Sequence, residues 1–414
     1  MFHEKSLRNE KPLLRILIST LLTVAVAAIT CGNGQAAVAT PPSVTAAFSS
    51  HWERPLRLTK DKIKTPGLLP ADCRLCHELQ YAPWSRSLHS KSMGPGLMGQ
   101  LSKDNPDFAT SCYFCHAPAK KQNEFILNNG EFTDNTEFDQ GLQDSGVSCA
   151  ICHLRGSVIN GPTGGTGSTG GSRNTGNNGS VNSAPHQITK NSIFKDSVFC
   201  SACHQLDGGF ELNGKSLTNT YREWLDSPYP AKEIHCQNCH MPEAKHLFLG
   251  IHDKETVRAA LDIKVQKSKK GKKEVITLSL KNTGAGHYLP TYVTPLIVAS
   301  IYLTDNSGEV IEDSLQKDLI GRVVKLDLSE EVMDSRIAPG GTHTFKYRPN
   351  YPKTKKGPFR TVIEVHVYPD DFYNRFFKEA LRVGAYNSRA LMQEALETTE
   401  RSPYLLFKEV IELN

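Results

Sequence analysis

Ten of the eleven cysteines in this 414-residue chain belong to five copies of one pattern, Cys-x-x-Cys-His. The copies are CRLCH at 73–77, CYFCH at 112–116, CAICH at 149–153, CSACH at 200–204 and CQNCH at 236–240. Random placement of eleven Cys and fifteen His would produce essentially no such pattern in a chain of this length. The chemistry that needs this spacing is therefore the strongest constraint on the fold.

The pattern suits covalent attachment of haem c, because two thiols can bond the two vinyl groups while the next imidazole reaches the iron. Zinc sites pair Cys-x-x-Cys motifs two at a time and need no His after each motif. A redox-active dithiol would explain one motif, and disulfides would need cysteines outside the motifs, which the chain after residue 39 lacks. We therefore predict five covalently bound haem c groups. The predicted attachment residues are Cys73, Cys76, Cys112, Cys115, Cys149, Cys152, Cys200, Cys203, Cys236 and Cys239, and the predicted iron ligands beside them are His77, His116, His153, His204 and His240.

An iron that only transfers electrons is usually six-coordinate, so each haem calls for a second ligand. Nine further His follow residue 39, which favours His over Met in this role. Five of them have Gly, Pro or aromatic neighbours suited to contact with a porphyrin, and we predict these as second ligands: His89, His186, His246, His252 and His287. His51 and His235 remain alternatives, whereas strand alternation favours a core position for His343 and a solvated one for His366. The turn-forming residues around His287 predict that it reaches an iron of the first domain and ties the two domains together.

The motifs divide the chain into a haem domain and a second domain. Their first cysteines are 39, 37, 51 and 36 residues apart, and the long interval holds a Gly-, Ser- and Asn-rich stretch at 156–185 that predicts a flexible insertion. About 37 residues per haem is too little chain to bury a core of its own, so the porphyrins are expected to supply it. The predicted haem domain spans 40–255.

Strand-like apolar runs with turn signals between them follow from residue 256 to 414. They lie at 261–266, 275–280, 296–303, 310–312, 319–326, 342–347 and 360–368. Apolar residues then recur at helical spacing over 372–381 and 391–396, and 404–413 could close a sheet as a last strand. The predicted fold class is α+β, with a loop-rich α-helical multihaem domain followed by an immunoglobulin-like β-sandwich with C-terminal helices.

Residues 1–39 are typical of an export signal, with a basic start, an apolar run from Ile16 to Thr30 and small residues at Ala37 and Ala39. An uncleaved membrane anchor and a lipoprotein modified at Cys31 are the alternatives. The expected location is periplasmic, or extracellular and associated with the outer membrane. The formal net charge is +5, which is too weak to indicate nucleic-acid binding.

Several stretches resemble bacterial multihaem cytochromes c related to hydroxylamine oxidoreductase and the tetrahaem cytochromes of ammonia oxidisers, some of which carry a C-terminal β domain. These stretches include Trp84 to His89, Cys149 to Arg155 with Gly161-Pro162 and Ala184-Pro-His186, Thr220 to Pro228, Cys236 to Pro242, and Gly284 to Thr291. The resemblance covers about residues 70–300. It implies that the five additional His above are second ligands and that the role is electron transfer in a respiratory chain. The haem count and the Gly-rich insertion differ from the tetrahaem members.

The sequence thus predicts an exported pentahaem c-type cytochrome that carries electrons between respiratory partners, such as other cytochromes or a membrane quinol-linked complex. One alternative is an oxidoreductase in which one haem keeps an open site for a small nitrogen or sulfur compound. Another is a subunit that self-associates into an extracellular haem filament. The absence of a variant motif such as CxxCK favours an electron carrier over a catalyst.

Overall fold

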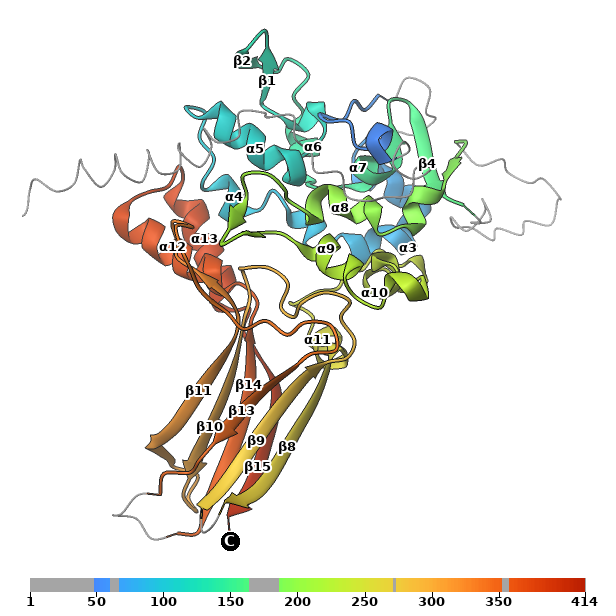
Figure 1. Cartoon of the computed structure of the whole chain (residues 1–414). Helices are drawn as coiled ribbons and strands as arrows, with labels where there is room; N and C mark the ends of the chain where they lie inside the picture. Colours follow the sequence, from blue (N-terminus) through green and yellow to red (C-terminus); the bar gives the residue numbers. More distant parts are fainter. Residues whose placement is uncertain (1–47, 60–66, 164–185, 271–272, 352–356, 414) are drawn as a thin grey trace, which may run out of the picture.

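The computed structural model describes residues 48–59, 67–163, 186–270, 273–351 and 357–413. They form a helical region up to residue 260 and a strand-rich region beyond it (Figure 1). This arrangement confirms the predicted α+β class. The predicted export signal at 1–39, with both of its alternatives, lies outside the described residues. Among the helices that are described, none is long and apolar enough to cross a membrane.

The helical region consists of short elements joined by loops. Its α-helices are α3 (Pro70–Trp84), α4 (Pro95–Met98), α5 (Pro106–His116), α6 (Gln140–Asp144), α7 (Cys149–His153), α8 (Val198–His204), α9 (Thr220–Leu225), α10 (Cys236–His240) and α11 (Lys254–Ala260). Its 3-10 turns are η1 (His89–Lys91), η2 (Lys120–Gln122), η3 (Ser192–Lys195), η4 (Pro230–Lys232) and η5 (Pro242–Ala244). Its short strands are β1 (Phe125–Asn128), β2 (Glu131–Asp134), β3 (Leu154–Arg155), β4 (Val158–Pro162), β5 (Thr189–Asn191), β6 (Glu211–Leu212) and β7 (Lys215–Ser216).

Every Cys-x-x-Cys-His motif lies on a helix. The helices α5, α7, α8 and α10 each end at the motif His, and in α3 the backbone leaves helical geometry at His77. Residues three positions apart lie on the same face of a helix, so both thiols of a motif face the same side. Because the helix ends at the motif His, the imidazole of that residue is not followed by a further helical turn.

The predicted insertion at 156–185 is only partly a loop. Val158–Pro162 forms β4, which pairs with β3 and β5, so the loop prediction is wrong for these residues. The reason is local, because Ile159 packs against the apolar cluster around Leu154 and Ile151. Residues 164–185 lie outside the described residues.

The strand-rich region is a sandwich of two antiparallel sheets. Its strands are β8 (Leu261–Lys270), β9 (Lys273–Asn282), β10 (Leu296–Thr304), β11 (Val310–Val324), β12 (Glu331–Asp334), β13 (Thr342–Tyr347), β14 (Phe359–Tyr368) and β15 (Tyr404–Leu413). The order is β12-β11-β10-β14-β15 in one sheet and β13-β9-β8 in the other. Alternate residues such as Leu278 on β9 and Ile301 on β10 are fully buried in one shared core.

Two strand predictions needed correction. The runs at 310–312 and 319–326 belong to the single strand β11, and β12 was not predicted. The polar stretch between the two runs is largely exposed, so its side chains can stay in water while the backbone pairs with β10. Alternation of apolar residues is therefore lost in β11 without a break in the strand.

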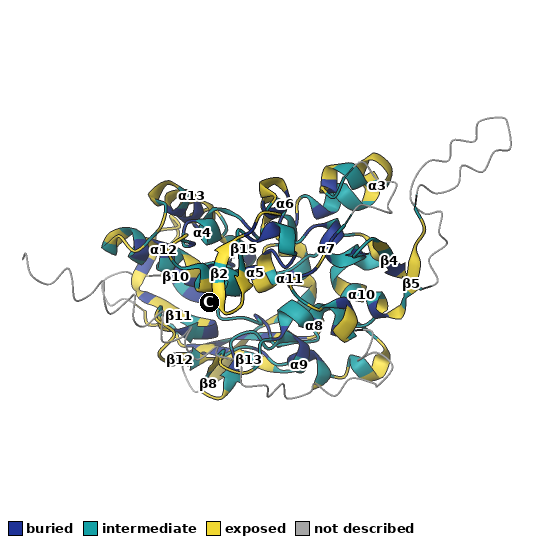
Figure 2. Cartoon of the chain, turned by 90° about the horizontal axis from the view of Figure 1, so that it is seen from above, coloured by how far each residue is buried: buried dark blue, intermediate teal, exposed yellow. Residues whose placement is uncertain are grey.

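The end of the chain returns to the helical region. The helices α12 (Asp371–Val383) and α13 (Arg389–Glu400) lie beside α4 in the view from above (Figure 2). The contact is close, since a Cβ added to Gly96 would lie 2.7 Å from the Phe377 ring and one added to Gly99 would lie 2.8 Å from the Met392 sulfur. Two glycines on the α4 segment thus allow the C-terminal helices to approach it.

Candidate haem-binding site

A large cavity of about 6530 Å³ runs through the helical region and is lined by all ten motif Cys and all five motif His. Small-molecule pockets usually enclose about 300–1,000 Å³, so this cavity can hold several large groups. The strand-rich region contributes part of its wall, through the loop around His287 and through Tyr373 on α12. The motif residues of five separate helices therefore face one shared space.

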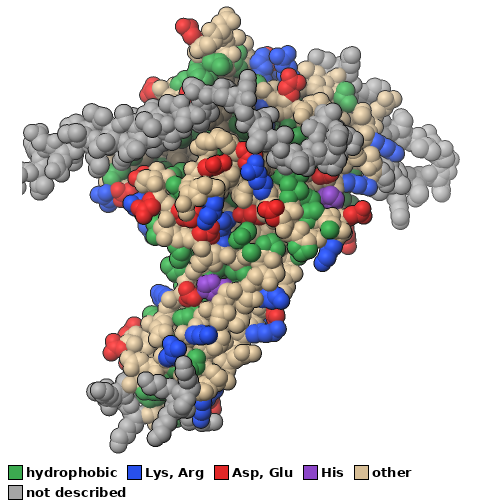
Figure 3. Space-filling model, in the orientation of Figure 1, with side chains coloured by type: hydrophobic (Ala, Val, Ile, Leu, Met, Phe, Trp, Pro, Cys, Tyr) green, Lys and Arg blue, Asp and Glu red, His purple; other side chains and the backbone are tan. Residues whose placement is uncertain are grey.

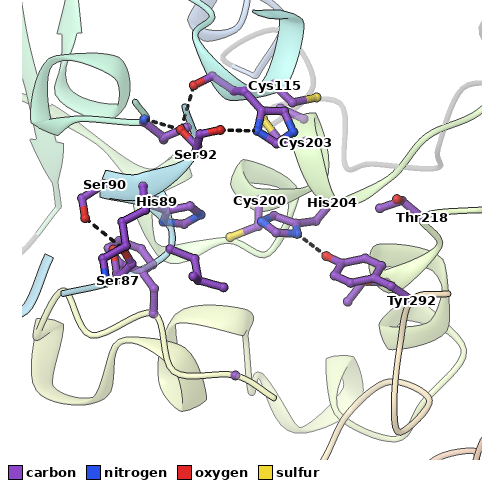
Figure 4. Close-up of a pocket in the computed structure, with 18 of the residues that line it drawn as sticks. Ser87, His89, Ser90, Ser92, Cys115, Cys200, Cys203, His204, Thr218 and Tyr292 are labelled. Atoms are coloured by element: carbon purple, nitrogen blue, oxygen red, sulfur yellow. Dashed lines mark hydrogen bonds between the residues drawn. The ribbon is translucent and has the colours of Figure 1, made fainter. Parts of the chain in front are cut away.

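Four motif imidazoles each lie opposite a His from outside the motifs. The distances between ring centres are 6.0 Å for His77 and His186, 6.1 Å for His204 and His89, 6.1 Å for His153 and His246, and 6.2 Å for His240 and His287. Two imidazoles that each hold a nitrogen about 2 Å from one metal ion have ring centres about 6 Å apart. The four pairs therefore fit four irons with two His ligands each. Figure 4 shows one pair, with the His89 and His204 rings on opposite sides of a gap.

Hydrogen bonds at Nδ1 orient most of these rings. Nδ1 contacts a backbone carbonyl oxygen in His116 (Ser92, 2.8 Å), His153 (Asn160, 2.9 Å), His246 (Ala244, 3.1 Å), His287 (Tyr288, 2.8 Å) and His240 (Leu249), and the Tyr292 hydroxyl in His204. A partner at Nδ1 fixes the tautomer and the ring plane, so that Nε2 is the nitrogen presented to a metal. These partners are mostly backbone atoms, which explains why the sequence did not reveal them.

Burial favours the neutral form of four of the paired imidazoles. Desolvation lowers the pKa of His89, His246 and His287 to about 4 and that of His204 to about 3. Neutral imidazole is the form that binds a metal ion.

The second motif differs from the other four. The Nδ1 of His116 contacts a backbone carbonyl oxygen, that of Ser92, as in the third and fifth motifs. Within the described part of the chain, however, no imidazole lies opposite the His116 ring. His252 is the predicted ligand that the structure leaves without a motif partner. Its Nε2 lies 3.0 Å from both carboxylate oxygens of Asp370, the residue directly before α12.

The other candidate His also have different partners. His51 uses Nε2 for a contact of 2.9 Å with the Cys152 carbonyl oxygen, and His343 uses it for one of 2.8 Å with Asp318. His235 accepts a hydrogen bond at Nδ1 from the Ser197 amide and its ring lies 5.6 Å from that of Trp224. His366 lies on β14, between β10 and β15, and does not line the cavity.

Thiols of different motifs lie near each other and shift each other's pKa, and the ten described Cys form no disulfide. The contacting pairs are Cys73 with Cys149, Cys115 with Cys203, and Cys200 with Cys236. A thiol of the fourth motif thus lies near one of the second and another near one of the fifth, and the first and third motifs are neighbours in the same way.

Buried donors beside the motifs also fit haem. Trp52 Nε1, Arg54 Nε and Arg155 Nη2 are buried without a protein acceptor, and the Arg54 and Arg155 side chains both stack on Trp52. Buried cations and donors of this kind need an acceptor to offset their lost hydration. Haem propionates would provide carboxylate oxygens of the right charge, so this side-chain set is compatible with the group.

Comparisons with known proteins agree with this chemistry. The family described as "Cytochrome c554 and c-prime" matches residues 72–154, which hold the first three motifs. The fold is similar to that of a penta-heme cytochrome c552 from Thermochromatium tepidum, with a TM-score of 0.55 and 15% sequence identity over 82% of this chain and 97% of that one. No curated protein matches the sequence. These findings support a multihaem c-type cytochrome with covalently bound haem c.

Proposed function

We propose that the protein is a pentahaem electron carrier in which each motif holds one haem c through two thioether bonds. The observation that carries the proposal is the set of four imidazole pairs with ring centres 6.0–6.2 Å apart, each joining a motif His to a His elsewhere. Bound haem supplies one-electron exchange between ferric and ferrous iron, and the protein's part is to hold the irons and exclude water.

The proposed second ligands are His186, His89, His246 and His287, for the first, fourth, third and fifth motifs respectively. Each candidate lies opposite a motif His, and for His246 and His287 the Nδ1 contact leaves Nε2 toward the partner ring. His252 is not included, because Asp370 occupies its Nε2.

The thiol pairs support two groups of neighbouring haems. Contacts between the first and third motifs, the second and fourth, and the fourth and fifth place the attachment points of these haems side by side. The haem of the fourth motif is therefore proposed to lie between those of the second and the fifth, while the haems of the first and third motifs form a neighbouring pair.

The proposed setting is outside the cytoplasmic membrane, where haem is attached to such motifs, with redox proteins or a quinol-linked membrane complex as partners. The signal features at 1–39 support this. On the face shown in Figure 3, basic and acidic side chains are interspersed, which favours transient contacts over one strongly charged docking patch. Self-association remains a further proposal.

Denaturing mass spectrometry tests the haem count. The mature protein should exceed its apoprotein mass by five haems, and a redox titration followed by absorption spectra should give a mainly low-spin signal. A mass increase of four haems or fewer in fully matured protein would contradict the proposal.

A second candidate function is supported by the second motif. Since no described imidazole lies opposite His116, the haem of Cys112 and Cys115 can keep an open coordination site for a small nitrogen or sulfur compound. Carbon monoxide binding to one haem in five of the reduced protein would support this function. A spectrum that carbon monoxide leaves unchanged would exclude it.

A further inference from the structure

Glu223 on α9 is a buried carboxylate at the junction of the two regions, and its side chain is only 2% exposed. Both of its oxygens are engaged by residues of the strand-rich region. Oε1 accepts a hydrogen bond of 2.9 Å from Arg336, while Oε2 accepts one of 3.1 Å from the Tyr288 amide and one of 3.0 Å from the Thr291 hydroxyl. A buried carboxylate needs such donors to offset its lost hydration.

Two of these hydrogen bonds bind Glu223 to the loop that carries His287. Tyr288 follows His287 directly, and Thr291 lies further along the same loop between β9 and β10. Arg336 holds the loop as well, since it donates a hydrogen bond of 2.6 Å to the Thr291 carbonyl oxygen. The side-chain amide of Asn282 donates to the His287 carbonyl oxygen at 2.9 Å, on the same peptide group whose N–H is held by Glu223. The peptide group that follows His287 is thereby held at both its N–H and its carbonyl oxygen.

We propose that Glu223 is a positioning residue for His287, holding its imidazole opposite His240. The inference rests on the proposed function, in which these two imidazoles bind one iron. Its basis is that α9 belongs to the helical region, whereas the loop that carries His287 follows β9 in the strand-rich region. The Glu223 carboxylate therefore fixes the position of this loop relative to the helical region. Loss of the carboxylate's reach should free the loop and weaken the iron bond that His287 makes.

A purely structural role for Glu223, as one of several ties between the regions, is the competing explanation. Lys215 on β7 offers a matched control, because it bridges to Glu331 at 2.8 Å and to Asp334 at 2.7 Å without touching the loop. Lys215→Ala removes ion pairs between the two regions but none of the hydrogen bonds that Glu223 and Arg336 make with the loop.

The test compares Glu223→Ala, Glu223→Asp and Glu223→Gln with Lys215→Ala in the full haem-loaded protein. Haem count is measured by mass, spin state by magnetic circular dichroism, and ligand loss by carbon monoxide binding. We expect five haems in each variant. In Glu223→Ala and Glu223→Asp, one haem more than in the unaltered protein should become high-spin and carbon-monoxide-reactive. Asp retains the charge but is one methylene too short to reach both Arg336 and the loop.

Glu223→Gln should stay largely low-spin, because its amide oxygen can still accept from the Tyr288 amide and the Thr291 hydroxyl. Lys215→Ala should match the unaltered protein. If Glu223→Ala does not mature, the Asp and Gln pair decides the matter. Low-spin spectra in Glu223→Asp, or equal high-spin signals in Glu223→Asp and Lys215→Ala, would overturn the inference.

The variant His287→Ala distinguishes the positioning role of Glu223 from the assignment of His287 as an iron ligand. One additional high-spin haem in His287→Ala, together with unchanged spectra in Glu223→Asp, would refute the positioning role alone. Unchanged spectra in His287→Ala would refute the ligand assignment, and the positioning role with it.

Discussion

The two regions of the molecule bury their residues in different ways. In the strand-rich region, nineteen buried residues from both sheets and the loops between strands form one apolar cluster with Val257 of α11, and Leu278, Ile301 and Val365 are fully buried in it. The clusters of the helical region are separate and hold six buried residues or fewer. The difference indicates that the strand-rich region can fold on its own side chains, whereas the helical region depends on the groups attached to its motifs.

The largest expected effect comes from withholding haem attachment. Protein made without the attachment machinery should lose amide protection throughout α5, α7, α8 and α10 while β9, β10 and β14 stay protected. The reason is that only the sandwich has a continuous core of side chains. Hydrogen exchange followed by mass spectrometry measures both regions in one sample. Equal protection of the helices with and without haem would break the comparison.

Arg322→Ala should loosen the link between the regions. Its fully buried side chain pairs with Glu331 and donates to the carbonyl oxygens of Leu212, Lys215 and Ser216 in the β6–β7 hairpin. Because removing one partner leaves buried polar groups unpaired, the expected loss is about 3–5 kcal/mol of unfolding free energy. Denaturant titration measures this loss.

Arg360→Ala is the control for that variant, since Arg360 is half-exposed and its Nε lies 3.6 Å from the Glu412 carboxylate, which is too long for a hydrogen bond. It should cost less than about 1 kcal/mol. Equal losses in the two variants would show that the hairpin contacts do not stabilise the junction.

Leu278→Ala should destabilise the sandwich by about 2–5 kcal/mol, because it opens a cavity in a fully buried position of β9. The haem spectra of the folded protein should stay unchanged, since Leu278 lies in the sandwich core and not in the haem cavity. Val410→Ala on β15 is the matched control, because Val410 is half-exposed. A change of haem spin state in Leu278→Ala would show that the two regions are more tightly coupled than their cores suggest.

The smallest expected effect is on pH dependence. Burial alone would raise the pKa of Asp334, but hydrogen bonds from Arg336 and Lys215 outweigh it and hold the pKa well below its ordinary value. A depressed pKa stabilises the fold above the unfolded pKa of about 4, and this contribution is lost as the pH falls further. Asp334→Asn should therefore flatten the decline of thermal stability on acidification. A decline as steep as in the unaltered protein would assign it to other carboxyl groups.

Local patterns were sufficient for part of this protein. Haem attachment needs two thiols and an imidazole within five consecutive residues, so the motifs mark their chemistry wherever the chain goes. Alternation predicted most strands of the sandwich for a similar reason, because each residue's face depends only on its neighbours. Alternation did not predict the full length of β11, because the polar stretch in the middle of this strand is largely exposed.

The pairing of imidazoles depended on the tertiary structure alone. His246 and His252 lie in one short segment with similar neighbours, yet the fold brings His246 opposite His153 and directs His252 to Asp370. The sequence marked both as possible ligands, because a side chain's chemistry is set by its type. Which partner each one meets is set by how helices and loops far apart in the chain pack together, and no spacing within the segment encodes that. The grip of Glu223 on the His287 loop was likewise invisible until α9 and the end of β9 were placed side by side.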